Sequence, residues 1–83
     1  MTNKVLHLNV SSPEKELYDG EITFISLPGT AGSFNILPHH APIVSSLKKG
    51  TVRYITADGS EHSIDIRGGF VEMSNNTASV CVS

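Results

Sequence analysis

Four histidines and one cysteine are the side chains of this sequence best suited to bind a metal ion. His39 and His40 are adjacent, so in an extended segment they would point to opposite faces and could not easily chelate one ion. No cysteine or carboxylate lies near them at the spacing of a zinc site, and Cys81 alone cannot form a thiolate site or an internal disulfide. We therefore predict no metal and no cofactor, and expect Cys81 to be a small apolar residue of a strand.

Catalytic motifs are also missing from the sequence. No serine occurs in a Gly-x-Ser-x-Gly setting, in which a nucleophile is held on a sharp turn. Gly68 and Gly69 lack the Lys-Ser/Thr pair and the following helix of a P-loop, so they indicate a bend or bulge between strands. A chain of 83 residues has little room for a deep cleft together with catalytic groups. We predict a protein that is not an enzyme by itself.

Composition and charge exclude further classes of protein. A net charge of −2 provides no basic excess to neutralise the phosphates of a nucleic acid. No apolar run reaches the roughly 18 residues of a membrane span, and no apolar segment after a charged start marks a secretory signal. We expect a single domain over residues 1–83 that is made and kept in the cytoplasm.

Strands must position these side chains, because the sequence has fourteen Val and Ile against four Ala and few helical cues. Asp58-Gly59 predicts a two-residue type I′ hairpin turn, and Ser74-Asn75-Asn76 a turn in which Asn adopts positive φ. Residues 12–17 predict a short turn or an extended stretch. Apolar patterns predict strands at 4–10, 21–27, 43–47, 51–57, 60–67, 70–73 and 77–82. Without crossover helices, they indicate an all-β antiparallel sandwich or flattened barrel of about ten short strands in two sheets.

The segment 28–42 resembles neither a strand nor a simple turn. Two glycines near its start allow conformations closed to other residues, and two prolines stiffen its far end. A constrained loop with apolar side chains suits a binding surface, because little entropy is lost when it associates. It suits equally a plug that closes one open end of the sandwich, and the composition leaves both interpretations open. The apolar side chains in question are Phe34, Ile36 and Leu37.

The same segment resembles a known family. GTAGSFNILPHHAPI at 29–43, with YDGE at 18–21 and GTVR and GGFVE downstream, resembles the epsilon subunit of rotary proton-translocating ATP synthases. The order and spacing of these four elements agree across nearly the whole chain. Asn35 and His39 stand where the family has glycine, and Ser33 stands where it is often acidic.

The resemblance implies a non-catalytic central-stalk subunit of proton-transporting ATP synthase. Such a subunit binds the gamma subunit and the c-ring, and it couples rotation of the ring to ATP synthesis. It lies peripherally on the cytoplasmic side of the cell membrane and takes no nucleic acid as a partner. The helical pair that family members carry beyond the sandwich is absent here, so we expect a naturally short form that does not bind nucleotide in the family's manner. We expect the isolated chain to be a monomer.

The resemblance also assigns a contact segment for gamma and the ring. We expect charged replacements of Ile36 and Leu37 to weaken assembly while the isolated sandwich still folds. His40 is the strongest single candidate, because the resemblance places it on the face towards the rotor. The residues predicted to contact gamma and the ring are Ser33, Phe34, Asn35, Ile36, Leu37, Pro38, His39, His40, Ala41 and Pro42, with Tyr18, Gly20, Glu21, Gly68, Gly69 and Phe70 as second choices.

The alternative function is a stand-alone small β-domain that binds a peptide or ligand.

Overall fold

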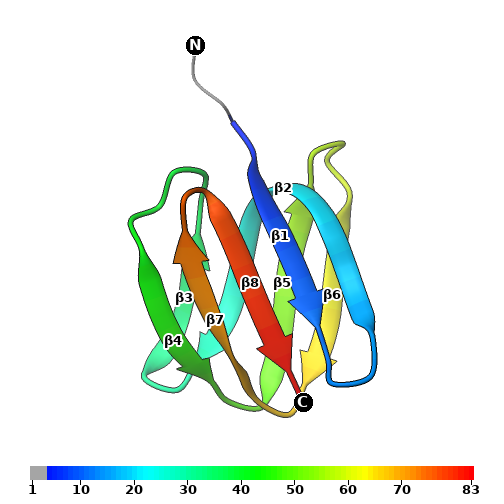
Figure 1. Cartoon of the computed structure of the whole chain (residues 1–83), viewed down its shortest axis with the longest axis vertical. Coiled ribbons are helices and arrows are strands. Elements are labelled where there is room, and N and C mark those ends of the chain that lie inside the picture. Colours follow the sequence, from blue (N-terminus) through cyan, green and yellow to red (C-terminus); the bar gives the residue numbers. More distant parts are fainter. Residues whose placement is uncertain (1–3) are drawn as a thin grey trace.

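The computed structural model describes residues 4–83, which form eight strands and, over that range, no helix (Figure 1). None of these residues therefore belongs to a helix long and apolar enough to cross a membrane. The predicted all-β class is confirmed, with fewer strands than expected. The strands are β1 (Leu6–Ser11), β2 (Glu16–Gly29), β3 (Gly32–Ile36), β4 (Ile43–Leu47), β5 (Gly50–Thr56), β6 (Glu61–Ile66), β7 (Gly69–Ser74) and β8 (Thr77–Val82).

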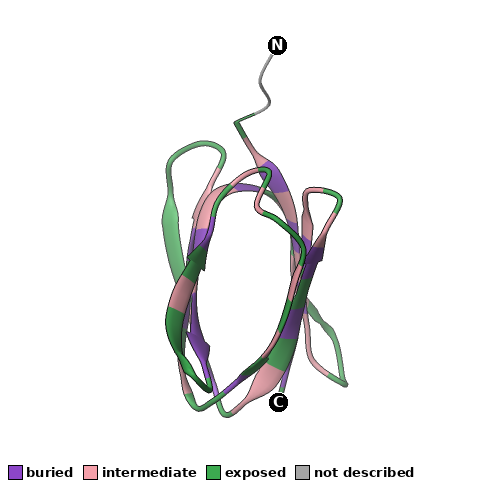
Figure 2. Ribbon diagram, turned by 90° about the vertical axis from the view of Figure 1, so that its left-hand side faces the viewer, coloured by how far each residue is buried: buried purple, intermediate pink, exposed green. Residues whose placement is uncertain are grey.

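The strands pack in two layers, seen edge-on in Figure 2. One layer has the order β4-β7-β8-β1 and continues into the first half of β2. The other consists of the second half of β2 with β3 on one side and β5 followed by β6 on the other. The register of β2 against β5 shifts between Ile22 and Phe24. Because such a bulge bends a strand, β2 can belong to both layers and join them.

One strand pairing departs from the predicted antiparallel arrangement. β1 and β8 run parallel, with Leu8 opposite Ala78 and Val10 opposite Val80. The other pairings among the described strands are antiparallel. The first and last strands therefore lie side by side within one sheet, a contact between chain ends that no local pattern encodes.

Alternating side chains fill the space between the two layers. Each fully buried aliphatic side chain stabilises the fold by roughly 1.5–3 kcal/mol relative to exposure. Within residues 4–83, no polar or charged side chain is buried, so apolar packing carries the stability of the sandwich. The largest fully buried side chains are Leu6, Leu8, Val10, Ile22, Ile25, Leu27, Ile36, Val52, Val71, Met73 and Val80.

The turn between β5 and β6 differs from the prediction. The Thr56 N–H donates to the Ser60 carbonyl (2.9 Å), and the Gly59 N–H donates to the Thr56 carbonyl (2.8 Å), which closes a loop over residues 57–59. Only Gly59 in this loop has positive φ (91°), whereas a type I′ turn needs positive φ at Asp58 as well. The hairpin is confirmed and its predicted turn type is wrong. A three-residue loop that ends in a left-handed glycine is the next commonest solution.

A turn with two positive φ angles occurs instead between β7 and β8. Asn75 (φ 50°) and Asn76 (φ 59°) lie between Ser74 and Thr77, which face each other across the two strands. The predicted use of Asn at positive φ is confirmed here. Both angles suit the right-handed twist of the paired strands, so this turn is a rigid end of the hairpin.

Gly69 allows β7 to approach β8 closely. Its φ is +146°, and a Cβ atom there would lie 2.0 Å from the carbonyl oxygen of Cys81. The chain bends just before it, where the Ser83 N–H donates to the Gly68 carbonyl (3.1 Å). The predicted bend at the glycine pair is confirmed, and Gly69 is required by the architecture.

Replacing Gly69 with alanine should lower the free energy of unfolding by about 2–4 kcal/mol, because strain at positive φ adds to a clash with backbone. Gly32 is the matched control, since its φ is +138° but a Cβ atom there would have no other atom within 4 Å. Gly32→Ala should therefore cost only about 1–2 kcal/mol. Urea unfolding of both variants measures the difference. Equal losses would contradict the close approach of Gly69 to Cys81.

Asp58 should titrate well below its ordinary range. Hydrogen bonds from the Thr56 hydroxyl and from the Ser60 N–H (3.0 Å) lower its pKa to about 2. Because the folded pKa lies below the unfolded value of about 3.9, the stabilisation is complete above that value and is lost as pH falls towards 2. Titration of the Asp58 carboxyl carbon by NMR checks this. A midpoint near the unfolded value would show that the loop does not hold the carboxylate.

Candidate interaction surface

The structure divides the predicted contact segment into a strand and a loop. Its first part belongs to β3, where Phe34 lies opposite Leu27 and Ile36 opposite Ile25 on β2. The sequence prediction missed this strand, because the glycines and prolines around it indicate a loop. Ser33 and Asn35 alternate with the inward residues and are exposed. The segment is therefore not one continuous surface.

Ile36 and Leu37 have opposite environments although they are adjacent. Ile36 is 0% exposed and belongs to the core, against which Phe34 packs half-buried. Leu37 is 53% exposed. No partner can reach the Ile36 side chain in this fold, so we now expect a charged replacement of Ile36 to disrupt the sandwich. The plug interpretation describes Phe34 and Ile36, whereas an exposed surface begins at Leu37.

The loop over residues 37–42 has a defined backbone conformation. The His40 N–H donates to the Leu37 carbonyl (3.1 Å) and closes a turn around Pro38 and His39. His39 has φ +65°, in the left-handed region that favours glycine. This agrees with the resemblance, in which glycine occupies that position. Ala41 and Pro42 are exposed and lead into β4.

His40 is half-buried within this loop, and a hydrogen bond determines its tautomer. Its Nδ1 lies 2.6 Å from the Ala41 carbonyl oxygen, which can only accept, so Nδ1 carries the proton and donates. In the neutral ring, Nε2 is then an acceptor. No three His, Cys, Asp or Glu side chains of residues 4–83 gather at distances suited to a metal ion.

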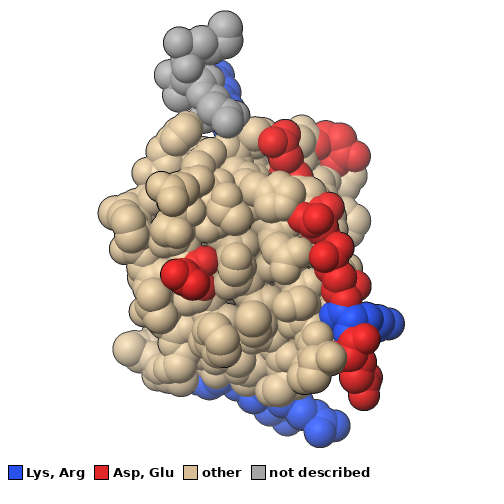
Figure 3. Space-filling model, viewed as in Figure 1, with Lys and Arg blue, Asp and Glu red and all other residues tan. Residues whose placement is uncertain are grey.

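A second exposed apolar area covers the outer face of β4 and β7. Val44 is 74% exposed and Phe70 is 52% exposed. Phe70 lies opposite Ser46 on β4 and opposite Cys81 on β8, and Val44 lies opposite Glu72. Figure 3 shows this face as largely uncharged apart from an isolated acidic group, with a row of acidic groups along one edge and basic groups at the lower end. Glu72, opposite Val44, is exposed on β7. A partly apolar strand face with few charges is typical of a contact surface.

The sequence prediction did not include Val44 among the exposed contact residues. The signal was present, because Ile43 and Val44 are consecutive and only one of two neighbouring strand residues can face the core. Phe70, a second-choice residue, lies on this face. Cys81 is in a strand as predicted but is exposed, with the Ser11 hydroxyl donating to its Sγ at 3.9 Å.

A groove of about 370 Å³ adjoins the same face. It lies between the turn before β2, the start of β7 and the end of β8, with Phe70, Pro13 and Cys81 among its walls. Its lining is mainly apolar, so it offers a place for an apolar side chain of a bound molecule.

The Tyr18-to-Glu21 element is part of the architecture. The Tyr18 ring packs on Tyr54 with 4.8 Å between ring centroids, and Tyr54 stacks on His62 at 5.3 Å. The Tyr18 hydroxyl donates to the Glu21 carbonyl (3.4 Å) and passes over Gly20, where a Cβ would lie 2.6 Å from the hydroxyl oxygen. Partial burial raises the pKa of Tyr18, and nearby carboxylates raise it further.

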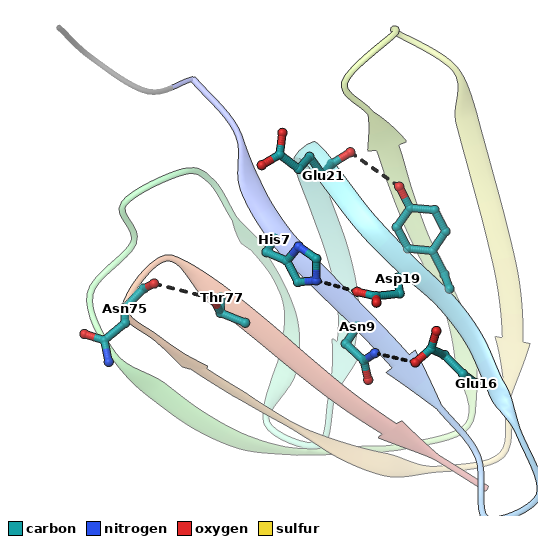
Figure 4. A network of polar contacts seen from close by, with 8 residues as sticks. His7, Asn9, Glu16, Asp19, Glu21, Asn75 and Thr77 are labelled. Atoms are coloured by element: carbon teal, nitrogen blue, oxygen red, sulfur yellow. Dashed lines mark hydrogen bonds and ion pairs between the residues drawn. The ribbon is translucent and has the colours of Figure 1, made fainter.

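Polar side chains cover β1 and the first half of β2 (Figure 4). The His7 ring nitrogen Nε2 is hydrogen-bonded to the Asp19 carboxylate, and the Asn9 side chain donates to the Glu16 carboxylate (3.1 Å). His7 thus lies on the outer face of its strand, as predicted. Exposed pairs of this kind contribute only about 0–1 kcal/mol. The outer face of this layer therefore changes from acidic at β2 to partly apolar at β4 and β7, where Glu72 is the one charged residue of those two strands.

Comparison with known proteins identifies relatives along nearly the whole chain. The sequence model of a family described as ATP synthase, Delta/Epsilon chain, beta-sandwich domain matches residues 5–83. An ATP synthase epsilon chain of Chlorobium limicola is 42% identical over 77 residues, which cover 93% of this chain and 88% of that relative. One from Delftia acidovorans is 39% identical over 75 residues, which cover 90% of this chain and 54% of the relative. The chain thus spans about half the length of the latter.

Solved structures share the fold. A chain in the cryo-EM structure of Euglena gracilis mitochondrial ATP synthase (OSCP, F1 and c-ring) matches with a TM-score of 0.91 and 15% identity, over 99% of this chain and 52% of that one. A chain in the central stalk and c-ring structure of Tetrahymena thermophila mitochondrial ATP synthase matches with a TM-score of 0.76 and 20% identity, over 98% and 64%. At these identities the likeness shows a common fold.

Substitutions of the adjacent residues Ile36 and Leu37 test whether the core ends at Ile36 and the exposed surface begins at Leu37. Ile36→Glu should lower the free energy of unfolding by at least about 3 kcal/mol, because it buries an unpaired charge. Leu37→Glu should change it by no more than about 0.5 kcal/mol, as is usual for exposed positions. Urea unfolding of both variants, followed by circular dichroism, checks this contrast. Similar losses in both would show that the loop after β3 is also core.

Proposed function

The chain belongs to the ATP synthase delta/epsilon chain family through its β-sandwich domain, and from this we propose that it is the epsilon subunit of a rotary proton-transporting ATP synthase. In the central stalk it binds the gamma subunit and the c-ring, so that rotation of the ring reaches the catalytic head and drives ATP synthesis. It catalyses no reaction itself. It lies at the cytoplasmic side of the cell membrane, held there by the complex. The match of residues 5–83 to the family is the observation that carries this proposal.

The architecture supports a mechanical role. A joint that transmits torque must not deform, and protein interiors packed at crystal-like density resist deformation. β2 is 14 residues long and is paired with β1 at one end and with β3 and β5 at the other. A force applied to one layer therefore passes to the other through a continuous strand and a common core.

Two exposed regions supply the contacts with partners. The first is the loop over residues 37–42, which presents Leu37 and His40, and the second is the β4–β7 face with Val44 and Phe70. Both carry apolar groups whose burial against a partner lowers the free energy, and they are surrounded by polar residues, with the charged Glu72 beside Val44 in the second region. Ser33 and Asn35 extend the first region along the outer side of β3.

The alternative function is a stand-alone β-domain that binds a peptide or ligand. The groove beside Phe70 is the observation that favours it, because its lining could take an apolar side chain of a free ligand. The two functions differ in the partner that occupies the Phe70 side of the sandwich.

Co-purification from mild detergent distinguishes the two functions. The tagged chain should recover gamma and the c-ring, and Val44→Glu should weaken binding of gamma by about tenfold or more, since it buries a charge in the contact. Ser63→Glu on the outer side of β6 is the matched control and should bind as the unmodified chain does. Equal effects of both substitutions would contradict the β4–β7 face as the contact. Recovery of neither partner, with a monomer that binds a soluble ligand, would contradict the proposed function.

A further inference from the structure

Asn76 connects three segments at the end of the sandwich where β1 starts (Figure 1). Its Oδ1 accepts a hydrogen bond from the His39 N–H (2.8 Å), and its Nδ2 donates to the Val5 carbonyl (2.9 Å). Its own carbonyl accepts from the His7 N–H (3.1 Å). A carboxamide has both an acceptor and donors, so one side chain can bond to the loop over residues 37–42 and to the start of β1 at once.

The His39 contact occurs where the loop needs support. A non-glycine residue in the left-handed region costs about 1–2 kcal/mol, so the surrounding structure must hold it there. The φ of His39 is +65°, and the hydrogen bond from Asn76 ends on the backbone N–H of this same residue. A bond at that atom restrains the backbone directly and does not depend on the His39 ring.

Asn76 is itself a firm anchor. It occupies the second position of the turn between β7 and β8, with φ 59°, and the strand pairing continues directly from Ser74 and Thr77. Both β7 and β8 contribute fully buried side chains, among them Val71, Met73 and Val80. The position of the Asn76 amide is therefore set by the core and not by the loop.

We propose that Asn76 is a positioning residue for the loop: it holds His39 in the left-handed conformation and thereby fixes how Leu37 and His40 are presented to a partner. The inference rests on the proposed function, because the loop is one of the two proposed contact regions. A loop already held in its binding conformation loses less entropy on association and binds more tightly. Asn76 acts through His39, so its effect on binding does not require contact with the partner.

Three substitutions separate this role from a general effect on the turn. Asn76→Gly keeps positive φ accessible and removes the amide, and Asn75→Gly is the matched control in the same turn at a similar φ (50°). The Asn75 side chain is exposed, and its carbonyl accepts from the Thr77 hydroxyl (3.5 Å), so this control leaves that backbone acceptor in place (Figure 4). Asn76→Asp keeps an acceptor for the His39 N–H and loses the donor to Val5.

Amide hydrogen exchange of the full chain, measured by NMR, tests whether Asn76 holds the His39 backbone in place. Asn76→Gly should speed exchange of the His39 N–H by about fivefold or more and lower the order parameters of residues 37–41, while the amides of β3 and β4 stay unchanged. Asn75→Gly and Asn76→Asp should leave His39 protected. No change of His39 exchange in Asn76→Gly, or an equal change in Asn75→Gly, would overturn the inference.

Affinity for gamma and the c-ring tests the consequence and keeps the two proposals distinct. Asn76→Gly should weaken binding by about three- to tenfold, and Asn75→Gly should not. Faster His39 exchange in Asn76→Gly with unchanged affinity would support the positioning role of Asn76. It would contradict the loop as a contact region of the proposed function. Unchanged His39 exchange and unchanged affinity in Asn76→Gly would contradict the positioning role of Asn76 and leave the proposed function as it stands.

Discussion

The path of β2 is the constraint on which the rest of the sandwich depends. Its 14 residues start in the layer of β1 and end between β3 and β5, with the register shift after Ile22 as the point where the strand bends. Apart from that bend, the layers are joined by loops and by a short pairing of the end of β2 with β4, where Gly29 lies opposite Leu47. The buried Ile22, Ile25 and Leu27 belong to this one strand, so the residues that cross between layers also fill the core between them. Topology and packing therefore impose the same geometry.

A core made in this way leaves certain apolar side chains outside. Each strand buries one face. Residues 4–83 form no helix that could cover the other face. Val44 and Phe70 thus remain exposed on one layer and Leu37 at one end. The surrounding surface has few charges that would oppose association with a neutral protein surface. Exposure here follows from the architecture, and a partner that covers these groups removes its cost.

Local patterns predicted much of the fold and less of the site. Apolar patterns and their flanking turn residues placed Ile43–Leu47 and Thr77–Val82 at their observed bounds, because these signals lie within a few neighbouring residues. It could not reveal that β1 pairs parallel with β8, since that contact joins opposite ends of the chain. Nor could it separate Ile36 from Leu37, since apolar character does not say which of two neighbours faces the core. The family motif assigned the whole segment 33–42 to a contact, yet the motif mixes residues of the core with residues of the surface.

His39 shows how a departure from the family pattern is accommodated. A histidine where the resemblance has glycine strains the backbone in the left-handed region, but it also leaves the free loop fewer conformations than glycine would. The strain is tolerated because the Asn76 amide meets the His39 N–H from a turn that the core holds in place. The two residues are 37 positions apart in the sequence, so no local pattern links them. Together they replace the freedom of a glycine with a fixed geometry, which the proposed contact region requires.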